Sequence, residues 1–366
     1  LLFWPLNGPR SRVLKGHAGL VRSLNFVNDG THLVSSSQHD STVREWPLSG
    51  ESGERGRIIW ERPGAIYGYA VDPTYENILV AHQDANLGSA LLIPVGDPEP
   101  SETNLWPPQT AVVGPVTFSA DGRYAAASTW GAFSDEGAVI RVWVLESMDE
   151  QVFALRDDEG DDTLGLYERG VVRLCFTQDG DLLSAGYGGV RRWNLQTGEG
   201  QWLLRVPEDV VMNMDCSVDG RFVVTVEKPT LTSLEGSNLT FHDLARGDSR
   251  SVSTHGQRIY RVRTDPTGTV IATADAEGVI RVGTADDREP NLLLSDAGAT
   301  TALTVSPDGR WIASGDIDGA IRLWPMPDLS KPPLHTLPRE ELIAKLKTLT
   351  NLRLVRDLSL IHISEP

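Results

Sequence analysis

The feature that most constrains the fold is a unit of short apolar strand and polar turn that recurs along most of the chain. The last copy covers Ser306 to Trp324, where apolar runs alternate with Asp-Gly turns. Equivalent strand ends, spaced by roughly 40 to 58 residues, are Phe26, Val71, Phe118, Phe176, Cys216, Thr264 and Val305. Short strands separated by such turns predict consecutive antiparallel hairpins. A period of this length predicts four-stranded units packed side by side.

A second column supports the same units. The residue two positions before each strand end is apolar in all seven copies: Leu24, Tyr69, Val116, Leu174, Met214, Val262 and Leu303. An apolar residue at a fixed position predicts a strand buried between adjacent sheets. A sheet of three or four strands cannot bury both of its faces alone, so each unit needs neighbours.

The third strand of each unit repeats as well, and four copies end in tryptophan: Trp46, Trp143, Trp193 and Trp324. The first unit also has Gly16-His17, a strand serine (Ser35 or Ser36) and Asp40 in a turn. Together these residues resemble the WD-repeat (WD40) β-propeller family over roughly residues 10 to 338. The resemblance implies an all-β fold: a single seven-bladed propeller of four-stranded antiparallel blades, followed by a short C-terminal α-helix.

In that family, such residues tie a blade together internally, so a structural and not a catalytic role is expected for them. The expected tetrad of the first blade is His17, Ser36, Asp40 and Trp46. The last blade keeps Ser314, Asp318 and Trp324 but has no histidine. His255 precedes its strand end by nine residues, as His17 does, but its own blade has glycine in the tryptophan column.

Both ends of the chain suggest a fragment. Phe3-Trp4-Pro5-Leu6 resembles Glu45-Trp46-Pro47-Leu48, so residues 1–9 are interpreted as the remnant of a preceding blade. The next strand, Arg12 to Leu14, either closes the ring against the last blade or belongs to another propeller upstream. Family resemblance favours closure.

After the ring, residues 339–357 predict a short amphipathic helix and tail. This tail resembles the one that follows propellers in some large bacterial signalling proteins, including serine/threonine kinases. The final residues 358–366, LSLIHISEP, resemble a translated library adapter and are interpreted as an artefact.

Composition narrows the partners. The formal net charge of −17 disfavours nucleic acid and anionic membranes, because their phosphates would be repelled. No apolar run approaches eighteen residues, so no membrane span is predicted, and a cytoplasmic location is expected. Cys175 and Cys216 each lie on the first strand of a blade and are expected to be buried, reduced thiols.

Enzyme signatures are absent from the sequence, including GxxxxGK[ST], HExxH, GxSxG and paired CxxC motifs. The acidic stretch Asp157 to Asp162 lacks the ligand spacing of a calcium loop, so a solvated loop is expected. No catalytic residue, metal or cofactor is therefore predicted, and the chain is not expected to be an enzyme.

Insertions in three adjacent blades thicken one face. The residues predicted to form a protein-binding rim there are Trp130, Phe133, Tyr167, Arg169 and Tyr187. Aromatic residues and arginine are enriched at interaction hot spots. For Trp130 and Phe133, packing onto the neighbouring blade is an equal alternative.

The central channel offers a second place for function. Residues on first strands that could line it are Arg22, Tyr67, Arg173, Asn213, Asp215, Tyr260 and Arg261. With one carboxylate and no histidine, this set disfavours metal-dependent hydrolysis. The favoured interpretation is a non-catalytic scaffold for a protein or peptide, in a monomeric ring within a longer chain. The alternatives are a propeller enzyme or small-ligand binder that uses the channel, or a ring that only spaces other domains.

Overall fold

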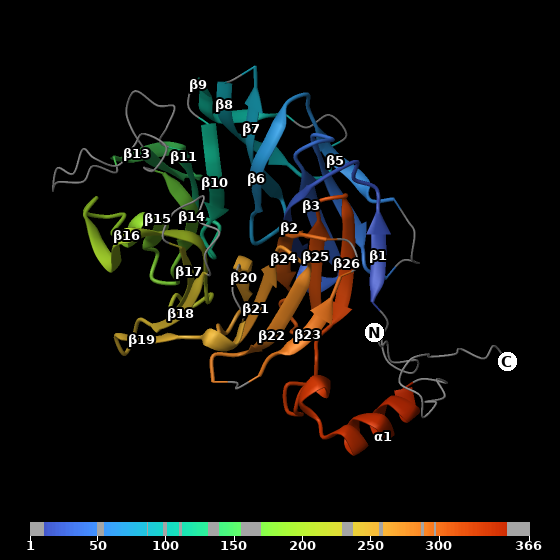
Figure 1. Cartoon of the computed structure of the whole chain (residues 1–366). Helices are drawn as coiled ribbons and strands as arrows, with labels where there is room; N and C mark the ends of the chain where they lie inside the picture. Colours follow the sequence, from blue (N-terminus) through green and yellow to red (C-terminus); the bar gives the residue numbers. More distant parts are fainter. Residues whose placement is uncertain are drawn as a thin grey trace.

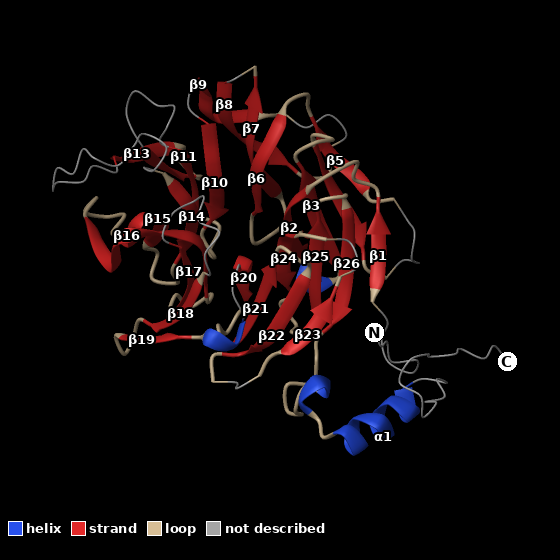
Figure 2. Ribbon diagram, in the orientation of Figure 1, coloured by secondary structure: helices blue, strands red, loops and turns tan. Residues whose placement is uncertain are grey.

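The structure is a computed structural model in which antiparallel strands make up most of the chain (Figures 1 and 2). It describes residues 11–49, 55–85, 87–97, 101–109, 112–130, 139–154, 170–228, 237–255, 259–286, 289–295 and 298–349. The predicted blade remnant at 1–9 and the predicted artefact at 358–366 lie outside these residues. The all-β class is confirmed.

Five sheets have four strands each, and in four of them the strands follow one another along the chain. The first contains β2 (Val21–Val27), β3 (His32–Ser37), β4 (Thr42–Pro47) and β5 (Arg57–Glu61). The second contains β6 (Ala65–Val71), β7 (Asn77–Asp84), β8 (Leu87–Pro94) and β9 (Thr103–Gln109). The third contains β10 (Val112–Phe118), β11 (Tyr124–Trp130), β12 (Val139–Val144) and β13 (Asp149–Ala154). A later one contains β20 (Ile259–Thr264), β21 (Val270–Asp275), β22 (Val279–Thr284) and β23 (Asn291–Leu294).

Between the third and this later sheet lies a six-stranded sheet. It contains β14 (Val171–Phe176), β15 (Leu182–Trp193), β16 (Gly200–Cys216), β17 (Phe222–Lys228), β18 (Asn238–Asp243) and β19 (Asp248–Ser251). The first half of β15 pairs with β14, and its second half pairs with the start of β16. The end of β16 then pairs with β17. Two repeat units therefore share this sheet through its two long strands.

The last sheet joins the two ends of the repeat region. It contains β24 (Thr300–Val305), β25 (Trp311–Asp316), β26 (Ala320–Pro325) and β1 (Arg12–Lys15). The early strand β1 runs antiparallel to β26, with Leu14 opposite Ile321 (Figure 1). Of the two alternatives for Arg12 to Leu14, the structure shows pairing with the last sheet.

Seven innermost strands follow one another around the molecule. Each packs against the next, and the last packs against the first, in the order β2, β6, β10, β14, β16, β20 and β24. The Thr301 hydroxyl on β24 donates a hydrogen bond of 2.7 Å to the Val21 carbonyl on β2. The last and first sheets are therefore joined directly.

Every one of these seven strands has a β-bulge, with one extra residue opposite the second strand, near the start of the strand or, in the long strand β16, near the start of the part that pairs with β17. A bulge bends a strand and re-aims its side chains. Arg22 lies at the extra position in β2, and Thr301 lies there in β24. The seven units thus repeat a local distortion as well as an apolar pattern.

The core lies between neighbouring sheets. Trp60 of the first sheet and Ile66 and Tyr69 of the second share one buried cluster, and similar clusters follow along the chain. The apolar column predicted from the sequence is buried in six copies, and Val116 is half-buried against its cluster. The prediction of strands buried between sheets is confirmed.

Helices are few in the described part of the chain. The helix α1 (Arg339–Leu349) follows the last sheet and lies apart from the strands (Figure 2), as the tail pattern predicted. Short 3-10 turns are η1 (Asn28–Gly30), η4 (Ser253–His255) and η5 (Leu334–Thr336).

The expectation of reduced thiols is wrong for this structure. A disulfide joins Cys175 on β14 to Cys216 on β16, across two adjacent innermost strands. Cys216 is itself a repeat strand end, whereas Cys175 precedes its strand end, Phe176, by one residue. The two cysteines therefore occupy different positions in the repeat, so the repeat did not predict that they lie close together.

Candidate functional site

The first sheet contains a buried network that joins two strands, β3 and β4, to the turn between them and to the loop before β2. The Trp46 indole N–H donates to the Ser35 hydroxyl at 2.7 Å. The Ser35 hydroxyl lies 2.7 Å from His17 Nε2, and His17 Nδ1 lies 2.9 Å from Asp40 Oδ2. Because a carboxylate only accepts, Nδ1 carries the proton, and a neutral ring then accepts from Ser35 through Nε2.

Asp40 is the fixed end of this network. Burial opposes its charge, but hydrogen bonds from His17, Thr42 and the Ala18 amide prevail and hold the pKa of the Asp40 carboxyl well below its usual value. Each polar group in the series Trp46, Ser35, His17 and Asp40 thus has a hydrogen-bond partner within this network. The arrangement has the form of a structural bracket.

Two predicted members of the tetrad are corrected. The bonds of the first sheet are made by Ser35, whereas the buried Ser36 hydroxyl has no hydrogen-bond partner in the described part of the chain. In the last sheet, Trp324 donates to Ser314 at 2.8 Å, but the turn is organised by Asp316 instead of Asp318. Asp316 accepts from the amides of Asp318 and Ala320 and pairs with Arg322 at 2.6 Å.

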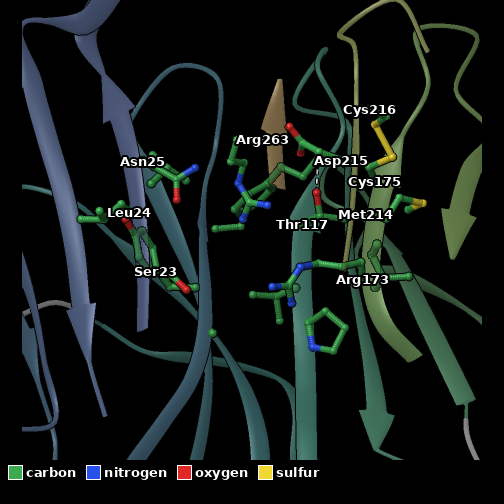
Figure 3. Close-up of a pocket in the computed structure, with 18 of the residues that line it drawn as sticks. Ser23, Leu24, Asn25, Thr117, Arg173, Cys175, Met214, Asp215, Cys216 and Arg263 are labelled. Carbon is green, nitrogen blue, oxygen red and sulfur yellow. Dashed lines mark hydrogen bonds between the residues drawn. A yellow bond between two sulfur atoms is a disulfide. The ribbon is translucent and has the colours of Figure 1, made fainter. Parts of the chain in front are cut away.

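The innermost strands enclose a cavity of about 440 Å³ (Figure 3). The predicted channel residues Arg22, Tyr67, Arg173 and Arg261 line it, together with Asp215. Arg263 also lines it and was not among the predicted channel residues. Arg263 follows Arg261 by two residues on β20, so strand alternation could have placed both side chains on one face.

Three of the cavity arginines reach across to the next innermost strand. Arg22 Nε donates to the Tyr67 carbonyl at 3.1 Å, and Arg173 Nε donates to the Asn213 side-chain oxygen at 3.0 Å. Arg261 Nε donates to the Thr301 carbonyl at 2.6 Å. These contacts fix each guanidinium at a junction between neighbouring units.

Burial and like charge act together on these groups. Burial lowers the pKa of Arg173 well below its usual value, and repulsion from Arg261, Arg263 and Arg22 lowers it further. Burial, then repulsion from Arg22 and Arg263, lowers the pKa of Arg261 to about 9. Burial raises the pKa of Asp215, against the influence of Arg263. The cavity is therefore a concentrated positive site.

Tyr260 was predicted to line the channel, but it is not among the residues around this cavity. Its side chain is 44% exposed, and the Lys228 ammonium lies 5.0 Å from its ring centroid. Tyr260 occupies the extra position of the bulge in β20, as Arg22 does in β2, but unlike Arg22 it does not line the cavity. We place it at the end of the sheet and outside the cavity.

The predicted rim is described only in part. Tyr187 is half-buried and lies opposite Val210, which in turn lies opposite Lys228. Trp130 ends β11, and its backbone pairs with Val112 at the start of β10. It therefore lies at the end of the third sheet where the second strand finishes and the first strand begins. Phe133, Tyr167 and Arg169 lie outside the described residues.

The described residues contain no group of three or more His, Cys, Asp or Glu side chains placed to hold a metal ion. Over the same part of the chain, no helix has the length and apolar character needed to cross a membrane. The one carboxylate in the cavity, Asp215, accepts from the Thr264 amide at 2.7 Å and its hydroxyl at 3.1 Å.

Comparison with known proteins gives matches at both ends of the repeat region. Residues 8–47 and 294–325 match the family described as WD domain, G-beta repeat. The first segment contains the hydrogen bond from Trp46 to Ser35, and the second contains the one from Trp324 to Ser314. The matches support a relationship to WD40-repeat proteins.

Two curated proteins are similar over longer or shorter stretches. Telomerase protein component 1 of Rattus norvegicus is 25% identical over 213 residues, which is 57% of this chain and 7% of the relative. WD repeat and SOCS box-containing protein 1 of Takifugu rubripes is 32% identical over 60 residues, which is 16% of this chain and 14% of the relative. The chain thus spans a small share of either relative.

Proposed function

We propose that the chain forms a closed seven-bladed WD40 β-propeller that acts as a non-catalytic scaffold for a protein or peptide partner. The observation that carries this proposal is the succession of seven bulged innermost strands, in which the last packs against the first. WD40 matches in the first and last sheets support it. A frame of this kind holds its loops rigidly, and binding residues are often on such loops.

The docking face we propose is the end of the sheets where second strands finish and first strands begin. Tyr187, Lys228 and Tyr260 lie there on adjacent units, and Trp130 ends the second strand of the third sheet. Exposed apolar residues also occur at this end in other sheets, namely Leu87 and Ile317. Phe133, Tyr167 and Arg169 belong to the same proposed rim by their place in the sequence.

Affinity capture with paired variants tests this proposal. The rim variant combines Trp130→Ala, Tyr187→Ala and Tyr260→Ala. The matched control combines Met148→Ala and Val218→Ala, two exposed residues in turns at the opposite end of the sheets. We expect the unaltered chain and the control to retain the same partner and the rim variant to lose it. Circular dichroism confirms that all three are folded, and retention by the rim variant would refute the face.

The wider setting is proposed from resemblance alone. The tail after the ring supports a docking or sensory part of a bacterial signalling protein, acting in the cytoplasm as one ring of a longer chain. The Cys175–Cys216 disulfide favours a more oxidising environment, since disulfides are rare in the cytosol. Thiol titration of freshly lysed cells distinguishes the two settings.

A further inference from the structure

The cavity enclosed by the innermost strands has the opposite charge to the rest of the protein. Its lining contains four arginines, Arg22, Arg173, Arg261 and Arg263, and one carboxylate, Asp215. The whole chain has a formal net charge of −17. Figure 3 shows Arg173 and Arg263 extending into the same space, with Asp215 near Arg263. Like charges gathered in a partly desolvated space repel one another strongly.

None of these four arginines forms an ion pair with a carboxylate among the residues that the structure describes. Their hydrogen bonds go to backbone carbonyls and to one side-chain amide oxygen. Each uses at most two of its five N–H donors in this way. Arginines on outer strands differ, since Arg281 pairs with Asp275 and Arg322 with Asp316, both at 2.6 Å.

We propose that this cavity binds a compact polyanion with at least two phosphate groups. Four guanidinium groups and one carboxylate leave three unbalanced positive charges, since 4 − 1 = 3. Two phosphate groups neutralise that charge within a small volume, and their oxygens match the planar fork of arginine. This inference concerns the cavity and is independent of the rim.

The size of the cavity and the charge of the chain decide between anions. A cavity of about 440 Å³ is in the range of small-molecule sites. An extended polyanion such as nucleic acid would also meet the negative outer surface, which disfavours it. A carboxylate group carries only one negative charge. Three carboxylates would be needed to balance the three positive charges of the cavity, whereas two phosphate groups are enough.

The clustering of the arginines also predicts how their replacement affects the stability of the ligand-free protein. Each arginine removed relieves repulsion among those that remain, so a neutral replacement of similar length should not weaken the ligand-free fold. The same replacement removes donors from the anion. An arginine whose only role is to join neighbouring strands would show the reverse, with loss of stability and unchanged anion binding.

Isothermal titration calorimetry with inorganic pyrophosphate tests the proposal, at about 50 mM salt so that screening stays weak. We expect one pyrophosphate per chain, and Arg173→Gln and Arg263→Gln each weaken it by about tenfold or more, the effect of losing a charged hydrogen bond. The matched control is Arg310→Gln, whose side chain is exposed beside Asp308 on a turn between β24 and β25. It should leave the affinity unchanged.

Thermal melts of the same proteins give a second measurement. Pyrophosphate should raise the melting temperature of the unaltered chain and of Arg310→Gln, but not that of the two cavity variants. Absence of binding to the unaltered chain would overturn the proposal, as would equal weakening by Arg310→Gln or unchanged affinity in both cavity variants. Citrate that binds as tightly as pyrophosphate would overturn the assignment to phosphate.

Discussion

The first and last sheets both link their third strand to their second through a tryptophan–serine hydrogen bond, but they stabilise the adjoining turn with different side chains. In both, a buried tryptophan on the third strand donates to a serine on the second, Trp46 to Ser35 and Trp324 to Ser314. The first sheet completes this bracket with His17 and Asp40. The last sheet lacks the histidine and secures its turn by the Asp316 ion pair with Arg322. The tryptophan–serine bond is thus separable from the rest of the network.

Two further sheets extend the comparison. In the six-stranded sheet, His242 occupies the tryptophan position and its Nε2 lies 2.9 Å from the Thr225 hydroxyl. In the sheet that begins with β20, Asp275 pairs with Arg281 as Asp316 does with Arg322. The six-stranded sheet thus repeats the polar link from the third strand to the second, and the sheet that begins with β20 repeats the turn aspartate.

The largest expected effect comes from removing the turn aspartates. Asp316→Ala removes a buried carboxylate that pairs with Arg322 and accepts from two turn amides, which costs about 3 to 5 kcal/mol of unfolding free energy. Asp40→Ala should cost less, about 1 to 3 kcal/mol, because Asp40 mainly accepts hydrogen bonds from His17, Thr42 and the Ala18 amide, and its nearest guanidinium, Arg44, is 4.0 Å away. Urea denaturation of both variants measures the two losses.

Asp318→Ala serves as the control for this pair, since Asp318 was the residue predicted from the repeat. Its backbone amide donates to Asp316, whereas its carboxylate accepts none of the turn hydrogen bonds in the part of the chain that the structure describes. A change within about 0.5 kcal/mol is expected for such a surface substitution. A larger loss at Asp318 than at Asp316 would reverse the assignment of the turn.

Much of the fold could be predicted because it depends on local pattern. The apolar column from Leu24 to Leu303 marks strands buried between sheets, and Asp-Gly turns separate those strands in several units. The pairing of β1 with β26 could be stated only as one of two alternatives. It joins residues some three hundred positions apart, and no local pattern fixes such a contact.

The sites were predicted less well, since they depend on register. Ser35 and Ser36 are adjacent, and a shift of one residue along a strand moves a side chain to the opposite face. The repeat could not decide between them. The same limit applies to the Cys175–Cys216 disulfide, whose two residues differ by one position relative to their strand ends.

The histidine in the tryptophan position should make stability depend on pH. Burial lowers the pKa of His242 to about 4, from 6.5 in the ordinary state. Between these values the unfolded chain binds the proton and the folded chain does not, so stability falls as pH decreases from 6.5 to 4. The full loss is about 3 kcal/mol.

Urea denaturation at several pH values measures this loss. His242→Gln keeps a side-chain N–H that can donate to Thr225 and removes the titrating group, so its stability should vary less across this window. His32→Gln, at a half-buried position in the first sheet, is the control. If the two variants keep the same slope as the unaltered chain, His242 does not cause it.

The smallest effect distinguishes two neighbouring serines that are both fully buried. Ser35→Ala leaves the Trp46 indole N–H and His17 Nε2 without their shared partner, at a cost of about 1 to 3 kcal/mol. Ser36→Ala removes a hydroxyl that has no partner in the described residues, so the fold should lose nothing and could gain slightly. Because the two substitutions delete the same atom from adjacent sites, their difference in unfolding free energy isolates the bracket. Equal losses would mean that Ser35 contributes only volume, and the first sheet would then be held together by Asp40 and its turn, as the last sheet is by Asp316.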